Sequence, residues 1–493
     1  MTMVKELRGV LRLPLLQFLV LLLLIAILAG IACSQKQCVL DPDIWWHLRV
    51  GDWILQHHAV PHNGILSRTG SDRPWIAYSW GYEVLLAGAQ AATGLVGVAV
   101  FGLVLVLAVA FTLFEALRRV SGRFWLSCGL ATTGCYAFLF NIMPRPVFFS
   151  IILFTAVLAL ILKAERSGRA QPLYWLPVIF LLWANLHIQF VYGLFLVGLL
   201  VAANLLQRLA TSAGIAQHRL AALQLPFSRL FFVFAACVVA TCIGPYGPTL
   251  YKVIYGYAAA SFTYRVIHEL QPLDFRSLRH FVQLFLTAAA FYTLGSSKKM
   301  DLFRPLLLTA AGLVAFRTMR DSWFIVIPAV LCIAESLRCE SADVEGRSFL
   351  RTAGLAVASG FVVLLLALNL DFNARGLTRT ISGQYPVRAV EFIRSARLDG
   401  PLYNTLDWGG FLIWYLPEHP VAIDGRNDLY GDRLDFQFYQ IQMGVSPHEA
   451  DDILRGSRLV LLQREAPLAS ELNADPHFQL VYRDEIAVVF ARR

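Results

Sequence analysis

Asp41-Pro42-Asp43-Ile44-Trp45-Trp46-His47 is the stretch of sequence around which the rest of this chain is organised. It comes soon after an uncharged run, residues 13–32, which is long enough to cross a membrane as a helix. Carboxylates beside lipid are costly, so an acidic pair at this position indicates a function. Two interpretations stay open here. In one, an aspartate caps the following helix and the tryptophans anchor it at the lipid headgroups; in the other, the stretch belongs to an active site.

The composition indicates a multi-pass membrane protein. The 493 residues are 57% hydrophobic and only 15% charged, whereas roughly a quarter of the residues in a soluble protein are charged. The net charge of +9 comes from Lys and Arg residues in short loops between apolar runs, which indicates topology and contact with lipid phosphates. We therefore expect membrane lipids, and no nucleic acid, as partners.

The distribution of basic residues predicts the topology. With the N-terminus on the inner side and about eleven transmembrane helices, the Lys- and Arg-rich short loops lie inside, and the C-terminus lies outside. Five arginines fall on the outer side against this preference, which makes them candidates for binding an anion. They are Arg145, Arg265, Arg276, Arg317 and Arg320. For Arg320 the alternative is an ion pair with the neighbouring Asp321.

Two domains are expected. Residues 1–371 form an all-α polytopic membrane domain whose first outer loop covers residues 34–94, with helices at 45–57 and 80–92. Residues 372–493 are predicted to form a soluble α/β domain with a mostly parallel sheet, because short β-rich runs alternate with helical patterns. The expected strands are 401–404, 421–424, 459–463 and a hairpin within 480–492. Cys33 and Cys38 flank the outer end of the first span, and a disulfide between them in an oxidising compartment is left open.

Several motifs together resemble the GT-C superfamily of integral-membrane glycosyltransferases. The resemblance is to a bacterial branch with a periplasmic C-terminal domain. The Asp407 motif is also similar to a tryptophan–aspartate–glycine signature of oligosaccharyltransferase catalytic subunits. Ser79 departs from that branch, which often has an acidic residue there, and so do Ile188 and Gln189, where a small pair is expected. The motifs are Asp41-Pro42-Asp43 with Trp45-Trp46-His47-Leu48, Arg73-Pro74-Trp75, Trp183-Ala184-Asn185-Leu186-His187, Pro245-Tyr246-Gly247, Asp407-Trp408-Gly409-Gly410 and Asp424-Gly425-Arg426.

The resemblance implies an enzyme that moves a sugar from a polyprenyl-phosphate-linked donor to an acceptor glycan, lipid or protein on the outer face of the membrane. It implies a multi-pass protein of the bacterial inner membrane, with a cytoplasmic N-terminus and a periplasmic C-terminal domain. The alternative is a non-catalytic protein that binds the lipid carrier or assists assembly in an envelope polysaccharide pathway. Such a protein would need the outer arginines but not the carboxylates.

For catalysis, an outer carboxylate would act as general base or hold a divalent cation such as Mg or Mn. We expect Asp43 in this role, with Asp41 as its partner. Glu83 and His47 are either further ligands or acid–base groups, or they make ordinary hydrogen bonds at the membrane interface. A residue before proline is steered away from helix, so the Asp-Pro-Asp spacing predicts an extended chain whose two carboxylates share one face. Two carboxylates that close would repel each other unless they shared a cation or a proton.

The remaining candidates would bind substrate. Arg317, Arg320 and Arg145 suit a lipid phosphate, because a guanidinium group matches phosphate oxygens. Asn185 and His187 either orient the sugar or phosphate or satisfy the backbone of a tight membrane turn. Asp407 and Arg426 lie at predicted strand ends, where sites of α/β sheets usually occur; the alternative is that the neighbouring glycines only permit a turn.

Overall fold

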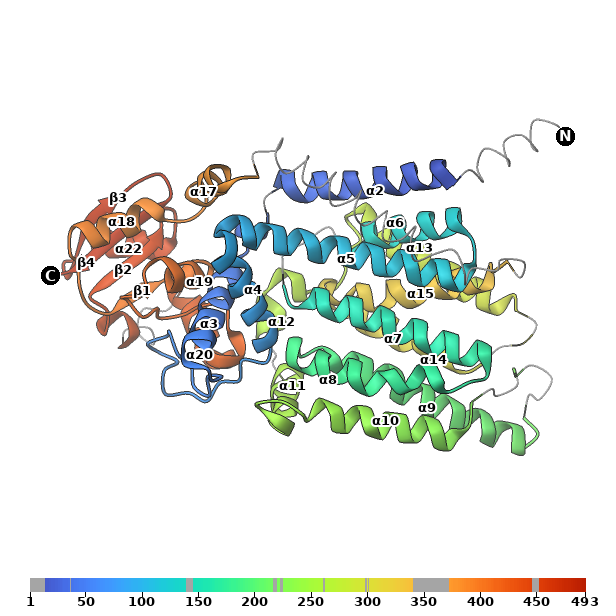
Figure 1. Ribbon diagram of the computed structural model, residues 1–493. Helices are drawn as coiled ribbons and strands as arrows, with labels where there is room; N and C mark the ends of the chain where they lie inside the picture. The colour runs from blue at the N-terminus through green and yellow to red at the C-terminus, as the bar shows by residue number, and fades with distance from the viewer. Residues whose placement is uncertain are drawn as a thin grey trace.

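A computed structural model of the chain describes residues 14–35, 37–138, 145–215, 220–221, 225–259, 262–297, 299, 301–339, 372–445 and 452–493. Most of these residues are helical, and Figure 1 shows a bundle of long helices with a small sheet beyond one end. This confirms the expected mostly helical chain with a small sheet. Two predictions lie outside the described part: the eleventh span, within residues 340–371, and the Cys33 side chain needed for a disulfide with Cys38.

The bundle is made of apolar helices of unequal length. By length and composition, three of the described helices can cross a membrane: α5 (Leu95–Ser121), α7 (Val147–Ser167) and α9 (Phe190–Ser212). Several others have 11 to 18 residues, which at about 1.5 Å per residue is shorter than a hydrocarbon core of about 30 Å. The count of eleven spans therefore stays a prediction. The further bundle helices are α2 (Pro14–Gln35), α6 (Phe124–Phe138), α8 (Leu176–Leu186), α10 (Phe227–Thr241), α13 (Leu278–Gly295), α14 (Phe303–Arg317) and α15 (Trp323–Ser336).

The centre of the bundle is α15, in which every residue from Trp323 to Ala334 is buried. Large apolar side chains on the outer helices point away from it and are mostly exposed, as Phe232, Tyr292 and Leu313 are. A soluble monomer rarely exposes so many large apolar groups, because water contact with them is unfavourable. This surface is the one expected of a protein surrounded by lipid, and the chain is a membrane protein.

Two short helices, α3 (Pro42–His57) and α4 (Trp80–Thr93), lie across one end of the bundle, which we call the α3 end (Figure 1). Both helices were expected from the sequence. Asp41 caps α3: its backbone is extended, and its side chain accepts a hydrogen bond from the backbone N–H of Asp43 at 3.0 Å. Pro42 occupies the first helical position, where its missing N–H is not needed. The expectation of an extended chain is thus correct for Asp41 and wrong for Asp43, which belongs to the first helical turn.

Trp45 and Trp46 of α3 are core residues, and their expected role as membrane anchors is wrong. Trp45 is fully buried, and its ring meets the rings of Tyr385, Phe411 and Tyr415 with centroids 5.3–6.0 Å apart. Trp46 is also buried, next to His47. Large aromatic surfaces gain more from this packing than from the headgroup region, because burial removes the whole ring from water. The tryptophans therefore join α3 to the C-terminal part of the chain.

Residues 372–493, which we call the C-terminal region, contain a four-stranded sheet with the order β1-β2-β4-β3. Its strands are β1 (Leu402–Asn404), β2 (Leu459–Gln463), β3 (Phe478–Arg483) and β4 (Ala487–Arg492), and its helices are α17 (Ala374–Ser382), α18 (Val387–Ser395), α19 (Leu406–Tyr415), α20 (Asn427–Gln442) and α22 (Pro467–Ala474).

The sheet differs from the expected one in two respects. Only β1 and β2 are parallel, whereas β4 pairs antiparallel with both β2 and β3, so a mostly parallel sheet is wrong. The apolar run 421–424 is not a strand of this sheet, since Val421 forms an isolated bridge with Ser67 of the first outer loop. The expected hairpin is confirmed: the Asp484 carboxylate accepts the N–H groups of Ile486 and Ala487 and so closes the turn. The domain boundary after residue 371 stays a prediction.

Glycines let the C-terminal region approach α3 closely. A Cβ atom on Gly410 of α19 would lie 2.2 Å from the carbonyl oxygen of Pro42, and one on Gly425 would lie 2.0 Å from Oδ1 of Asp43. Real Cβ atoms do not come so near, so a side chain at position 410 must push α3 and the C-terminal region apart, and one at position 425 must displace the Asp43 carboxylate. The Tyr385 hydroxyl donates to the carbonyl of Leu40 at 2.9 Å beside this contact.

We expect Gly410→Ala to lower the midpoint of thermal unfolding of the purified protein. Overpacking of this kind costs about 1–3 kcal/mol. Gly88→Ala is the matched control, because a Cβ atom on Gly88, inside α4, would have no other atom within 4 Å, and alanine is the better helix former. Equal midpoints for the two variants would contradict the close contact between α19 and α3.

Candidate active site

Segments that are far apart in the sequence meet at the α3 end around a cavity of about 210 Å³. They are the first turn of α3, Arg145 just before α7, and two short turns, η5 (His268–Leu270) and η6 (Met319–Asp321). The C-terminal region closes the cavity. Its polar lining consists of Asp43, His47, Tyr78, Arg145, His187, Tyr257, Glu269, Arg320, Asp407 and Asn427.

Arg145 is the cation that the two aspartates share. Its Nε lies 2.9 Å from Oδ2 of Asp41 and its Nη2 lies 3.2 Å from Oδ1, so this pair has two parallel hydrogen bonds. The same Nη2 lies 3.4 Å from Oδ2 of Asp43. The sequence correctly predicted that the two carboxylates need a shared positive charge, but the charge comes from a residue about a hundred positions away.

Asp43 has the properties of a general base. Its side chain is 24% exposed and accepts a hydrogen bond from Nε1 of Trp46 at 3.1 Å. Burial raises the pKa of Asp43 to about 6, an effect that the Arg145 guanidinium opposes and the Asp41 carboxylate reinforces. A carboxylate with such a pKa is ionised at neutral pH and yet accepts a proton more readily than an ordinary aspartate.

Arg320 lies on the other side of the cavity, and Glu269 stands between it and Arg145. Oε1 of Glu269 is 2.7 Å from Nη1 of Arg145 and 3.6 Å from Nη1 of Arg320. Arg320 therefore faces Glu269, while Asp321 accepts hydrogen bonds from Gln189 and Thr318. Two guanidinium groups directed at one oxygen form a ready site for an anion.

Arg317, which the sequence also proposed for phosphate binding, lies elsewhere. It is exposed at the end of α14, with its guanidinium 5.9 Å from the ring centre of Tyr264, and it does not line the cavity. Arg317 precedes a turn and Arg320 lies within it, so the two side chains leave the chain in different directions. Of the three arginines proposed for phosphate binding, only Arg145 and Arg320 line the cavity.

Glu83 reaches the cavity only through His47. Oε1 of Glu83 lies 3.1 Å from Nδ1 of His47, both residues are buried, and His47 but not Glu83 lines the cavity. Burial raises the pKa of Glu83 well above its usual range and lowers the pKa of His47 well below its own, so it favours the uncharged form of both side chains. Such a pair can orient the imidazole and share one proton with it.

The predicted divalent cation does not fit these side chains. Asp41 and Asp43 already share Arg145, and Nδ1 of His47 already contacts Glu83. Within the part of the chain that the structure describes, no three His, Cys, Asp or Glu side chains form a group able to hold a metal ion. The Mg or Mn site of Asp43, Asp41 and His47 stays a prediction, and no step below depends on it.

His187 lines the cavity, whereas Asn185 does not. Nδ1 of His187, the residue that ends α8, is 2.7 Å from Oγ of Ser150, and this contact fixes the ring in the wall of the cavity that Arg320 also lines. Asn185 accepts from Nε1 of Trp80 at 3.0 Å and donates to the carbonyl of Ile243 at 2.9 Å. Of the two roles left open by the sequence, Asn185 therefore satisfies the backbone at the end of α8, and His187 remains a candidate for orienting substrate.

The two candidate substrate-binding residues of the C-terminal region, Asp407 and Arg426, lie in different places. Asp407 lies at the start of α19, exposed at the edge of the cavity. Arg426 is fully buried, makes two hydrogen bonds of 2.8 and 2.7 Å to Asp424 and donates to the carbonyl of Ile65, while its guanidinium stacks 4.7 Å from the ring centre of Trp75. Arg426 thus joins the C-terminal region to the first outer loop and does not line the cavity.

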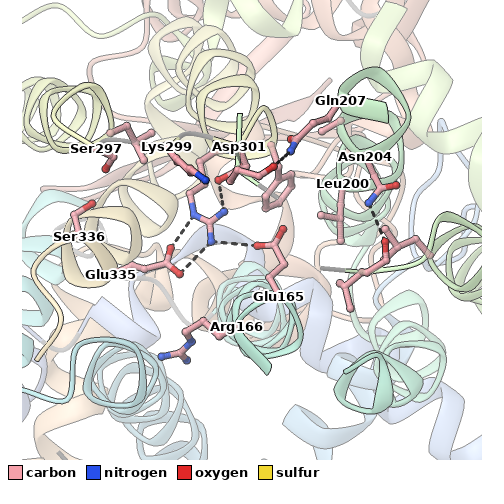
Figure 2. Close-up of a pocket in the computed structure, with 17 residues that line it drawn as sticks. Glu165, Arg166, Leu200, Asn204, Gln207, Ser297, Lys299, Asp301, Glu335 and Ser336 are labelled. Atoms are coloured by element: carbon pink, nitrogen blue, oxygen red, sulfur yellow. Dashed lines mark hydrogen bonds and ion pairs between the residues drawn. The ribbon is translucent and has the colours of Figure 1, made fainter. Parts of the chain in front are cut away.

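A second cavity at the opposite end of the bundle, about 530 Å³ in volume, is a weaker candidate. Figure 2 shows Glu165 of α7, Glu335 of α15 and Asp301, which precedes α14, pointing toward one another. They share Arg304, at distances of 2.5 to 3.1 Å. This arrangement joins the ends of α7, α14 and α15 that lie away from the α3 end, because the charges compensate one another.

The sequence missed several residues of the cavity. Glu269 was visible as an acidic residue in the same outer loops as the misplaced arginines, and its charge was the signal. Tyr78 and Tyr257, whose hydroxyl groups lie 3.0 Å apart, gave no signal because tyrosine is common near membrane surfaces. Asn427 likewise enters the cavity only because α20 begins there.

Comparison with solved structures finds similar folds at low sequence identity. ArnT from Cupriavidus metallidurans bound to undecaprenyl phosphate is 15% identical, with a TM-score of 0.51 over 96% of this chain and 97% of that one. Archaeal oligosaccharyltransferase AglB from Archaeoglobus fulgidus, in complex with an inhibitory peptide and a dolichol-phosphate, is 11% identical, with a TM-score of 0.49 over 90% and 69% of the two chains. No family model matches this sequence. No curated protein matches it.

At these identities the likeness concerns the fold, and it extends over nearly the whole of this chain and of ArnT. The chain therefore shares its overall fold with ArnT, and this agrees with the fold that the resemblance of its motifs implies.

Proposed function

We propose that the protein is a membrane glycosyltransferase that moves a sugar from a polyprenyl-phosphate-linked donor to an acceptor on the outer face of the membrane. One observation carries this proposal. A carboxylate with a raised pKa, Asp43, and two guanidinium groups, those of Arg145 and Arg320, line one small cavity at the end of a membrane bundle. Such a transfer needs a base that activates the acceptor and an anion site that stabilises the leaving phosphate.

The proposed chemistry is a single displacement. Asp43 accepts the proton of the acceptor hydroxyl while the hydroxyl oxygen forms a bond to the anomeric carbon, and the bond from that carbon to the phosphate oxygen breaks. The electron pair stays on the phosphate, whose growing negative charge is stabilised by Arg320 and Arg145. One displacement inverts the configuration at the anomeric carbon.

A larger cavity offers room for the acceptor. It has a volume of about 810 Å³ and shares Tyr257 and Asn427 with the cavity of Asp43. Its walls carry aromatic and charged side chains from the first outer loop, α11 (Leu250–Ala259) and α20, among them Trp75, Lys252 and Asp428. We propose that the acceptor approaches from this side and the lipid-linked donor from the bundle.

We expect Asp43→Asn to lower the rate of transfer about 10²–10⁴-fold, because the amide cannot take up the proton. Transfer is measured in proteoliposomes with a panel of undecaprenyl-phosphate-linked sugars. Asp52→Asn is the matched control on the same helix, since Asp52 pairs with Arg49 at the surface. Lipid binding by Asp43→Asn should persist. Full transfer by this variant would favour the non-catalytic alternative.

The rate of transfer should depend on pH through Asp43. Below its pKa of about 6 the base is protonated, so the rate should rise about tenfold per pH unit up to pH 6 and level off above it. Because Arg145 lowers this pKa, Arg145→Gln should move the inflection to higher pH. An inflection that stays in place in Arg145→Gln would show that another group is the base.

We expect Arg320→Ala to weaken the binding of undecaprenyl phosphate about 10–100-fold, because a hydrogen bond to a charged group contributes about 1.5–3 kcal/mol. Arg375→Ala, which removes an exposed arginine of α17, serves as the control. Binding is measured with labelled lipid in detergent. Equal affinities of the two variants would exclude Arg320 from the phosphate site.

A further inference from the structure

The cavity of Asp43 contains a carboxylate that the proposed reaction does not use. We infer that Glu269 occupies the place of the donor phosphate, and that this site accepts a phosphate with one negative charge, a phosphodiester, in preference to a diphosphate. The inference rests on the proposed function and specifies its donor: a sugar joined to the lipid through one phosphate.

The geometry of Glu269 is that of a bound anion. A single oxygen, Oε1, lies 2.7 Å from Nη1 of Arg145 and 3.6 Å from Nη1 of Arg320. The two guanidinium groups repel each other and need an anion between them, which a carboxylate or a phosphate oxygen supplies equally well. Burial disfavours the ionised form of Glu269, but both arginines stabilise it, and the pKa of Glu269 lies below its usual range.

Of the three carboxylates around Arg145, Glu269 is the one that can leave. Asp41 is buried and is held by two hydrogen bonds, whereas the Glu269 side chain is 34% exposed and stands on a three-residue turn. The backbone beside it is fixed, since the N–H of Met319 donates to the carbonyl of Gln271 at 3.0 Å. A rotation of the Glu269 side chain toward solvent is therefore sufficient to open the site.

The charges of the cluster limit what can replace Glu269. The cluster consists of two guanidinium groups, from Arg145 and Arg320, and three carboxyl groups, from Asp41, Asp43 and Glu269. With all five groups ionised, it carries one net negative charge. A phosphodiester that displaces Glu269 leaves this balance unchanged. A diphosphate adds at least one further negative charge close to the buried Asp41, where repulsion is poorly screened.

The net charge of the cluster also stays the same during the proposed reaction. The departing phosphate becomes a monoester and gains one negative charge when its bond to the sugar breaks. Asp43 loses one negative charge in the same step, because it accepts the proton of the acceptor. The two arginines therefore meet the same total charge before and after transfer, and no other group in the cavity has to change its protonation.

The test compares two lipid probes bound to the full-length protein in detergent at pH 8 and low salt. The probes are methyl undecaprenyl phosphate, a diester with one charge, and undecaprenyl diphosphate. We expect the wild type to bind the diester at least about tenfold more tightly. Glu269→Gln removes the competing carboxylate and one negative charge. It should bind both probes more tightly and the diphosphate most, so that the preference shrinks about fivefold or more.

Controls separate this inference from the proposed function. Glu269→Asp keeps the charge and should keep the preference of the wild type, and Glu485→Gln removes an exposed carboxylate of the β3–β4 turn and should change neither affinity. A wild type that binds both lipids equally, or a Glu269→Gln variant with unchanged affinities, overturns the role of Glu269 alone. A folded wild type that binds neither lipid overturns the proposed function, and the inference with it.

Discussion

The ion cluster around Arg145 is the constraint on which the α3 end depends. One guanidinium contacts Asp41, Asp43 and Glu269, which come from the start of α3 and from a loop more than two hundred residues later. Removing the arginine would leave partly buried carboxylates without a counter-charge, which costs several kcal/mol. The same interaction sets the acid–base property of Asp43, because Arg145 opposes the rise in pKa that burial causes. The ion pairs of Arg145 thus contribute both to the stability of the fold and to the proposed chemistry of Asp43.

The C-terminal region is part of this site and not an appendage to it. Gly425 lies directly against the Asp43 carboxylate, and Gly410 lies against the first turn of α3. Around them, Trp45 and Tyr385 fill the contact between α3 and the C-terminal region, so the position of Asp43 depends on how that region docks. A movement of the C-terminal region would change the exposure of Asp43, and with it the desolvation that raises its pKa.

Much of the framework could be predicted from the sequence. The apolar runs, the two helices of the first outer loop and the final hairpin all follow from local patterns, and the short spacing of Asp41 and Asp43 indicated that these carboxylates lie close together. The sheet was predicted with the wrong mixture of parallel and antiparallel strands, because strand partners depend on which elements cover each face, and short runs carry no such information. Trp45 was assigned to the membrane surface for a similar reason: an indole suits both a headgroup layer and a buried aromatic cluster.

The sequence by itself determined that this is a membrane protein with an acidic motif close to a long apolar run and with arginines in the segments between such runs. Composition and charge spacing are local properties, and both can be read directly from the amino-acid sequence. Only the tertiary structure decided which charges meet: Arg145 and Arg320 but not Arg317, Glu269 between the two arginines, and Arg426 away from the cavity. The physical reason is that electrostatic energy depends on distance and burial, and both are fixed only when distant segments pack together.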